Sequence, residues 1–166
     1  MVNHISELPS NSRIWIYQSD RPIEEETKKQ IIKLTNDFLA QWAAHGKNLL
    51  AASEIKENHF LIIATDEQFN TASGCSIDSQ FRFVQEIGVQ YGIDFFKRSN
   101  LAFEKNGSIQ LVDMKLIKTE IENRQISPDD IFFNNNIQTL AELSTEWKVK
   151  VNESWLKRYF TASESV

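Results

Sequence analysis

The sequence contains a single cysteine, three prolines and five glycines in 166 residues. One cysteine cannot form a disulfide within the chain, and it cannot build a zinc site without other ligands. The three histidines are scattered, and no His-x3-His or Cys-x2-Cys spacing occurs. Because metal ligands usually come with such spacing, we expect no metal site and no cofactor.

Long apolar runs and basic clusters are missing as well. No run approaches the roughly 18 residues that suggest a membrane span, and the N-terminal residues do not resemble a signal peptide. The net charge is −5 with no Lys/Arg cluster to offset it, which argues against nucleic acid as a partner. We therefore expect a cytoplasmic protein without a membrane span.

Aromatic residues are abundant: the chain has 11 phenylalanines and 4 tryptophans, and 41% of its residues are apolar. This composition is typical of a globular protein rather than a disordered or fibrous one. Large aromatic side chains bury much surface per residue, so we expect an aromatic core.

The first half of the chain alternates between strand-like and helix-like patterns. The apolar run from Phe60 to Ala64 is continuous, which predicts a central strand with both faces covered. The order strand, helix, strand, strand, helix predicts a split β-α-β layer of the ferredoxin-like kind over residues 13–92. The expected strands are 13–18, 49–56 and 59–65, and the expected helices run from 23 to 45, ending at Gly46, and from Ser76 or Ile77 to Tyr91, ending at Gly92.

The second half predicts a smaller hairpin-helix-strand unit over residues 95–160, so that the whole chain is α+β. Asn106-Gly107 lies between two apolar-rich runs and predicts a type I′ hairpin turn. Asp113 can cap the short helix that follows. Further expected elements are a strand at 131–133, a strand at 147–151 and a helix at 153–160, with irregular ends at 1–12 and 161–166.

Three phrases of the sequence, at residues 15–22, 73–78 and 154–160, resemble a family of short uncharacterised bacterial proteins, and the resemblance covers nearly the whole chain. Members of that family often carry the label "ABC transporter ATPase". A P-loop requires Gly-x4-Gly-Lys-[Ser/Thr] to wrap phosphates in backbone amides. The only Gly-Lys pair, Gly46-Lys47, is followed by asparagine and has no glycine five residues earlier. The sequence is therefore not that of a P-loop ATPase.

Residues 100–151 resemble the GYF-like domains that accompany bacterial membrane and signalling proteins. The matching features are the Asn106-Gly107 hairpin, the helix around Ile117, the segment 126–131 and Trp147. The Gly-Pro-aromatic segment of those domains is missing, and residues 110–112 stand near its place. The resemblance thus implies the fold of this unit more than proline-rich peptide binding.

The residues around Cys75 form the candidate catalytic site. A cysteine at a helix start has a stabilised thiolate, and Asp66 could lie close to it. His59 lies at the far end of the preceding strand, about 20 Å away at 3.3 Å per residue, so it is a poor base for Cys75. His45 and His4 could serve only if the fold brings them near. The neighbouring candidates for binding a ligand are Ser73, Gly74, Ser76 and Asp78.

The same residues also have structural interpretations. Cys75 could be a small apolar thiol packed at a helix start with Ser76 as the N-cap. Trp147 and Trp155 could line an aromatic groove for a peptide, or they could be core residues. Since nucleophilic sites usually show a paired base, our first hypothesis is a non-catalytic binding module for a protein or peptide. The second is a thiol-dependent enzyme or redox-responsive protein that uses Cys75. The sequence identifies neither the partner nor the oligomeric state.

Overall fold

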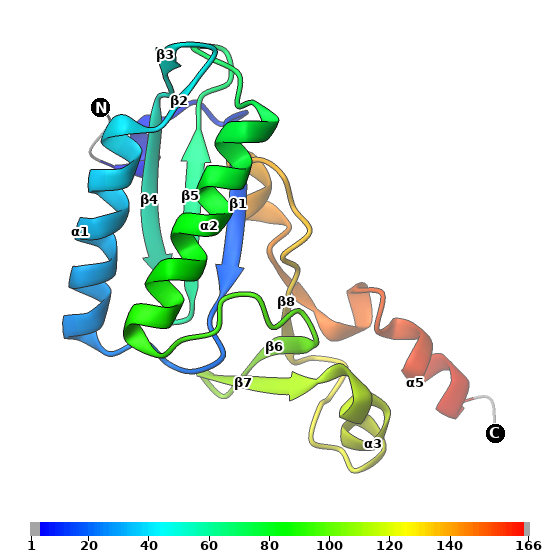
Figure 1. The fold of residues 1–166 in the computed structure, drawn as a ribbon. Helices are drawn as coiled ribbons and strands as arrows, with labels where there is room; N and C mark the ends of the chain where they lie inside the picture. The colour runs from blue at the N-terminus through cyan, green and yellow to red at the C-terminus, as the bar shows by residue number, and fades with distance from the viewer. Residues whose placement is uncertain (1–3, 165–166) are drawn as a thin grey trace. The chain divides into compact units, whose positions relative to one another are not determined.

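The computed structural model describes residues 4–164 and has the expected α+β composition. The chain divides into two compact units (Figure 1). Unit 1 comprises Met1–Lys97 and Gln138–Ala141, and unit 2 comprises Arg98–Ile137 and Glu142–Val166. In residues 4–164, no helix combines the length and the apolar character that crossing a membrane requires.

Unit 1 contains an antiparallel sheet with the strand order β1-β5-β4 (Figure 1). All six residues of the central strand β5 are buried, which confirms the interpretation of its continuous apolar run. Glu57 and Asn58 join β4 to β5 with φ values of 55° and 56°, as a type I′ turn requires. The strands are β1 (Arg13–Gln18), β4 (Ala51–Lys56) and β5 (Phe60–Thr65).

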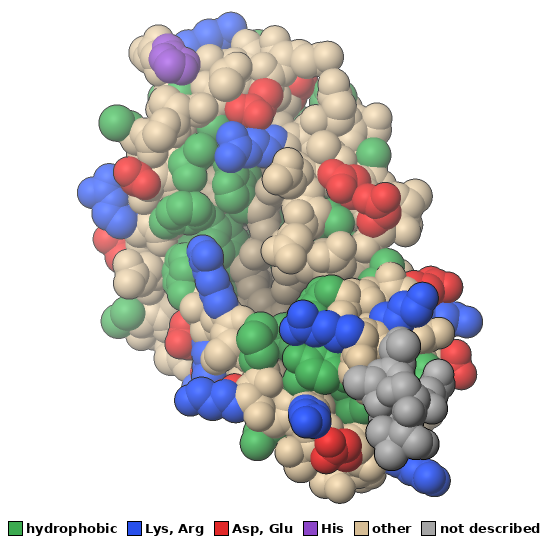
Figure 2. Space-filling model, turned by 90° about the vertical axis from the view of Figure 1, so that its right-hand side faces the viewer, with side chains coloured by type: hydrophobic (Ala, Val, Ile, Leu, Met, Phe, Trp, Pro, Cys, Tyr) green, Lys and Arg blue, Asp and Glu red, His purple; other side chains and the backbone are tan. Residues whose placement is uncertain are grey.

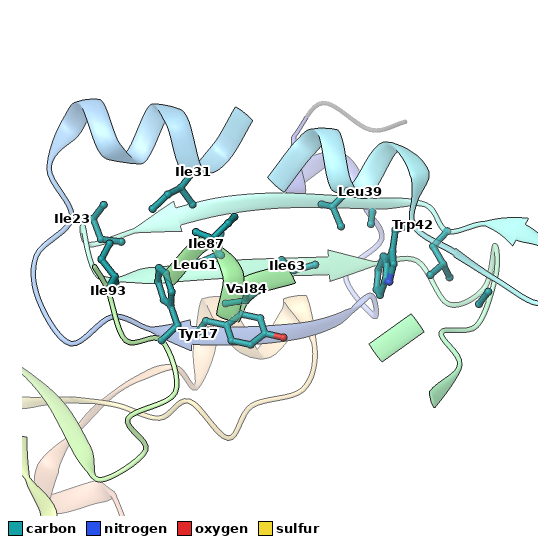
Figure 3. Close-up of a cluster of buried hydrophobic side chains, with 14 residues drawn as sticks. Tyr17, Ile23, Ile31, Leu39, Trp42, Leu61, Ile63, Val84, Ile87 and Ile93 are labelled. Carbon is teal, nitrogen blue, oxygen red and sulfur yellow. The ribbon is translucent and has the colours of Figure 1, made fainter. Parts of the chain in front are cut away.

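The two long helices of unit 1, α1 (Glu25–Gln41) and α2 (Gly74–Tyr91), pack on the same face of this sheet. Figure 3 shows Leu61 and Ile63 of β5 pointing into the shared core. Side chains at alternate positions of a strand share one face, so both residues meet the helices. The helical side of the core includes Ile31, Leu39, Val84 and Ile87.

The end of the first helix was predicted wrongly. Helix α1 ends at Gln41, and the hairpin of β2 (Ala43–Ala44) and β3 (Lys47–Asn48) follows it. His45 and Gly46 form the turn with φ values of 56° and 75°. Two consecutive residues with positive φ are typical of a hairpin turn, so Gly46 serves the hairpin and does not end the helix.

Two short segments outside the long elements also differ from expectation. The N-terminal arm is not irregular throughout, because η1 (Ile5–Glu7) packs against β4 with Ile5 buried. Residues 138–141 return to unit 1 along the outer edge of β1. There the Ile14 N–H donates to the carbonyl of Gln138, at 3.0 Å. This antiparallel contact had no counterpart in the sequence pattern.

Unit 2 contains an antiparallel sheet with the strand order β7-β6-β8-β9. The predicted turn at Asn106-Gly107 is confirmed, with φ values of 54° and 79°. Asp113 caps η2 by accepting a hydrogen bond from the Lys115 N–H at 2.9 Å, which confirms its predicted role. The strands are β6 (Asn100–Lys105), β7 (Ser108–Asp113), β8 (Ile131–Phe133) and β9 (Lys148–Lys150).

The helical segments of unit 2 are short, and three of them contribute apolar side chains, among them Ile117, Ile121 and Val151, to one core with Phe103 and Phe132 of the sheet. The final helix, α5, was expected at 153–160 but runs from Lys157 to Glu164. The predicted irregular tail is therefore wrong up to Glu164, and residues 165 and 166 lie outside the described part. The other segments are η2 (Met114–Leu116), α3 (Ile117–Glu122), α4 (Leu140–Thr145) and η3 (Val151–Glu153).

Candidate functional site

A capping box fixes the start of α2. The Ser73 Oγ accepts a hydrogen bond from the Ser76 N–H at 3.1 Å, and the Ser76 Oγ accepts one from the Ser73 N–H at 2.8 Å. Ser73 is therefore the N-cap, and the helix begins at Gly74 rather than at Ser76 or Ile77 as predicted. Each hydroxyl satisfies a backbone donor that the helix cannot satisfy itself.

The loop before α2 is attached to the β2–β3 hairpin. The side-chain amide of Asn70 donates to the carbonyls of Ala44 (3.0 Å) and Lys47 (2.9 Å). The buried Trp42 indole donates to the carbonyl of Ser76 at 2.8 Å. Figure 1 shows the hairpin and the start of α2 at the same end of unit 1. The hydrogen bonds between these elements hold the predicted site in place.

Cys75 and Asp78 are exposed near the start of α2. Gly74 has no positive φ, and a Cβ there would meet open space, so neither backbone conformation nor packing requires a glycine. Asp66 is half-buried, and its carboxylate accepts a hydrogen bond from the Gln68 N–H at 3.0 Å. The structure thus gathers the residues predicted around Cys75 into one loop and helix start.

No histidine in the described part of the chain is hydrogen-bonded to Cys75. His59 precedes β5, whereas Asp66 follows it, and the Nδ1 of His59 lies 2.8 Å from the carbonyl oxygen of Glu57. His45 is exposed at the turn of the β2–β3 hairpin. Over residues 4–164, no three His, Cys, Asp or Glu side chains are grouped as metal ligands would be.

The two tryptophans predicted to bind a peptide have different surroundings. Trp147 is buried, and its indole N–H donates to the Oδ1 of Asn135 at 3.0 Å. Its ring also packs 5.0 Å from that of Phe133. These contacts give Trp147 a structural role in unit 2.

Trp155 is 40% exposed and belongs to an aromatic and cationic surface cluster. Its ring stands edge-to-face on buried Phe132 and on Tyr159, with centroid distances of 6.3 Å in both cases. The guanidinium carbon of Arg158 lies 5.3 Å from the Trp155 centroid and 5.1 Å from that of Tyr159. We call Trp155, Arg158 and Tyr159 the Trp155 cluster.

Sequence reasoning identified Trp155 but missed the other two members of this cluster. Their spacing of three and four residues from Trp155 was the available signal, because such spacing brings side chains together on a helical turn. Figure 2 shows apolar side chains next to Lys and Arg side chains on the face of unit 2 that carries α5.

Comparisons of the chain with protein-family models, with curated proteins and with solved structures found no match. Any function of the chain must therefore be inferred from the chemistry of its surfaces. At the start of α2 the oxygens of both serine hydroxyls already accept capping hydrogen bonds. At the Trp155 cluster an aromatic surface faces solvent.

Proposed function

We propose that the chain is a non-catalytic binding module that contacts a protein or peptide through the Trp155 cluster. The observation that carries this proposal is a half-exposed tryptophan held against a buried aromatic ring and beside a guanidinium. Tryptophan, tyrosine and arginine are the residues most enriched among the energetically dominant positions of interfaces. Because Phe132 fixes one edge of the Trp155 ring, binding would cost little side-chain entropy.

The proposal includes a fold for each unit. For unit 1 we propose a ferredoxin-like layer, supported by the strand order β1-β5-β4 and by two helices on one face. Residues 138–141, which run antiparallel beside β1, would take the place of its fourth strand. For unit 2 we propose a GYF-like fold, supported by the β6–β7 hairpin and by Trp147 packed against β8. We also propose that the protein is located in the cytoplasm.

The competing proposal is a thiol-dependent or redox-responsive protein, which the exposure of Cys75 favours. It would require a base, and no histidine of the described residues is hydrogen-bonded to the sulfur. Alkylation of native Cys75 can be compared with alkylation of a free peptide covering residues 70–80. If Cys75 of the native protein is alkylated at least tenfold faster than the peptide cysteine, the result supports the thiol-dependent hypothesis. An equal or slower rate argues against that hypothesis and favours the binding module.

A library of random peptides displayed on phage tests the binding proposal. Peptides selected on the native protein are synthesised, and their affinity is measured by titration calorimetry. We expect Trp155→Ala to weaken binding at least about tenfold, equivalent to about 1.4 kcal/mol, and Arg158→Ala to weaken it as well. Val89→Ala is the matched control, since Val89 is 82% exposed on α2, outside the cluster.

Two outcomes would count against the proposal. One is a selection that enriches no peptide. The other is a set of peptides whose affinity is unchanged by both cluster substitutions. Because Trp155 packs on Phe132, its truncation can perturb the fold, so circular dichroism must be recorded for each variant. Arg158 is exposed, and its replacement keeps the test valid if Trp155→Ala is misfolded.

A further inference from the structure

The two edges of the unit 2 sheet are built differently. Strand β9 carries Lys148 and Lys150, both exposed. Strand β7 forms the other edge and is twice as long, with six residues against three. Its sequence, Ser-Ile-Gln-Leu-Val-Asp, contains no lysine, arginine or proline. Proteins commonly block edge strands with such residues, so β9 is protected in this way and β7 is not.

The geometry of the hairpin shows which backbone groups of β7 point outward. The N–H of Met114, which directly follows β7, donates to the carbonyl of Ser99, which directly precedes β6, at 2.7 Å. In an antiparallel pair, successive residues point their N–H and C=O groups alternately toward and away from the partner strand. The N–H and C=O groups of Ile109 and Leu111 therefore point away from β6. The pairing with β6 is unbroken, from Asn100 opposite Asp113 to Lys105 opposite Ser108. No bulge therefore interrupts this edge.

Apolar side chains accompany this edge. Ile109 and Leu111 are only partly buried. Met114 and Leu116, which follow β7 directly, are 46% and 53% exposed. Exposed backbone hydrogen-bonding groups next to apolar side chains are what an added strand can use.

We propose that a second copy of this chain pairs its own β7 antiparallel to this edge, about a two-fold axis at Leu111. In that register Leu111 faces its symmetry mate, and Ile109 faces Asp113 of the other copy. Asp113 is the only charged residue of β7. The two copies of Asp113 would lie about 14 Å apart, four residues at about 3.4 Å each, which exceeds the Debye length of about 8 Å.

This arrangement satisfies the requirement that a two-fold interface be self-complementary. The other edge fails it, because antiparallel pairing of two β9 strands would place Lys148 opposite Lys150, and like charges opposite each other are unfavourable. The proposed contact goes beyond the peptide-binding function and uses other residues than the Trp155 cluster. Either proposal can fail without affecting the other.

Disulfide trapping tests the register. In a Cys75→Ser background, Leu111→Cys places two thiols on directly opposed residues with Cα atoms about 5.5 Å apart, within the range of a disulfide. Ile109→Cys is the matched control, because its symmetry mate would lie about 14 Å away. We expect disulfide-linked dimers from the Leu111 variant under mild oxidation and at least tenfold less from the Ile109 variant. Equal cross-linking of the two variants would overturn the register.

Sedimentation velocity tests the association itself. We expect the wild type to form dimers with rising concentration, and Leu111→Lys, which protects the edge as the lysines of β9 do, to weaken dimerisation at least tenfold. Val89→Lys adds the same charge at an exposed position of α2 and should leave dimerisation unchanged. A wild type that stays monomeric up to about 0.5 mM, a concentration that detects very weak association, would refute the proposal. Pairing of β7 with a different protein would also refute it, because the occupant proposed is a second copy.

Discussion

A buried polar pair in the core of unit 1 allows a quantitative test of how its energy is distributed. The Tyr17 hydroxyl donates to the Oε1 of Gln80 at 2.5 Å, and both side chains are buried. The Nε2 of Gln80 is buried too, and it makes no hydrogen bond in the described part of the chain. A buried donor without a partner costs about 1–3 kcal/mol. The pair thus contains one hydrogen bond and one unsatisfied donor.

The two single substitutions should have different effects. Tyr17→Phe keeps the edge-to-face contacts with Phe81 and Phe96 but leaves both amide atoms of Gln80 unpaired, so we expect a loss of about 2 kcal/mol. Gln80→Leu removes the unsatisfied donor and leaves the Tyr17 hydroxyl without this acceptor. These two effects are similar in size and opposite in sign, so the net change should be within about 1 kcal/mol.

The double variant should be at least as stable as the wild type, because it removes every polar atom of the pair. In the Gln80→Leu background, Tyr17→Phe should therefore cost nothing or stabilise the protein. The coupling energy from the double-mutant cycle should be about 2 kcal/mol. Urea unfolding, followed by circular dichroism and by tryptophan fluorescence, measures all four free energies. Equal costs of Tyr17→Phe in both backgrounds would show that the hydrogen bond is not coupled and would refute the reasoning.

Two further substitutions test other contacts of unit 1. A Cβ on Gly88 would collide with the carbonyl oxygen of Ile93. Gly88→Ala should therefore lower the free energy of unfolding by about 1–3 kcal/mol through overpacking, more than the roughly 1 kcal/mol by which alanine favours a helix. Gly74→Ala places its Cβ in open space and should show no such loss in the same urea titration. Burial raises the pKa of the Asp20 carboxyl, but the Asp94 N–H and the Arg21 guanidinium lower it more, so its pKa lies below the usual value. The stability that Asp20 contributes is therefore present above a pH of about 4 and is lost as the pH falls through the lower folded pKa. The difference in melting temperature between wild type and Asp20→Asn should shrink from pH 5 to pH 3. A constant difference would contradict this linkage.

Local patterns predicted the elements whose cause is local. The run Phe60–Ala64 indicated a central strand because its side chains are apolar on both faces. The Asn106-Gly107 turn was predictable because both residues tolerate positive φ. The capping role of Asp113 depends only on a backbone donor two residues away. None of these features needs information from a distant part of the chain.

The missed features depend on distant partners. Helix α1 ends early because the chain turns at Trp42, whose indole bonds to the carbonyl of Ser76, 34 residues later. No local pattern contains that bond, and Gly46 by itself suggests a helix stop as readily as a hairpin turn. Residues 138–141 pair with β1 through a single bridge, which is too short to produce an alternating pattern.

The position of the loop and helix start was predicted more successfully than the hydrogen bonds that its side chains make. Residues 66–78 do form one loop and helix start, but the sequence did not reveal which polar atoms the backbone uses there. The first N–H groups of any helix lack partners within it, and buried donors must be satisfied. The hydroxyls of Ser73 and Ser76 meet this demand. Both oxygens therefore already accept a hydrogen bond, and the Ser76 hydroxyl also donates to the carbonyl of Ser73, at 2.8 Å.

The same reasoning supports our proposal that the Trp155 cluster, rather than the start of α2, is the binding surface. The polar atoms at the start of α2 gain little from a ligand, because their hydrogen bonds already exist in the free protein. The Trp155 ring is different, since 40% of the residue is in contact with water. Covering apolar surface contributes about 25 cal/mol per Å² before the costs of association are subtracted. A partner also gains from the Arg158 charge held beside the ring. We therefore expect more free energy from binding at the exposed aromatic surface than at hydroxyls that already cap a helix.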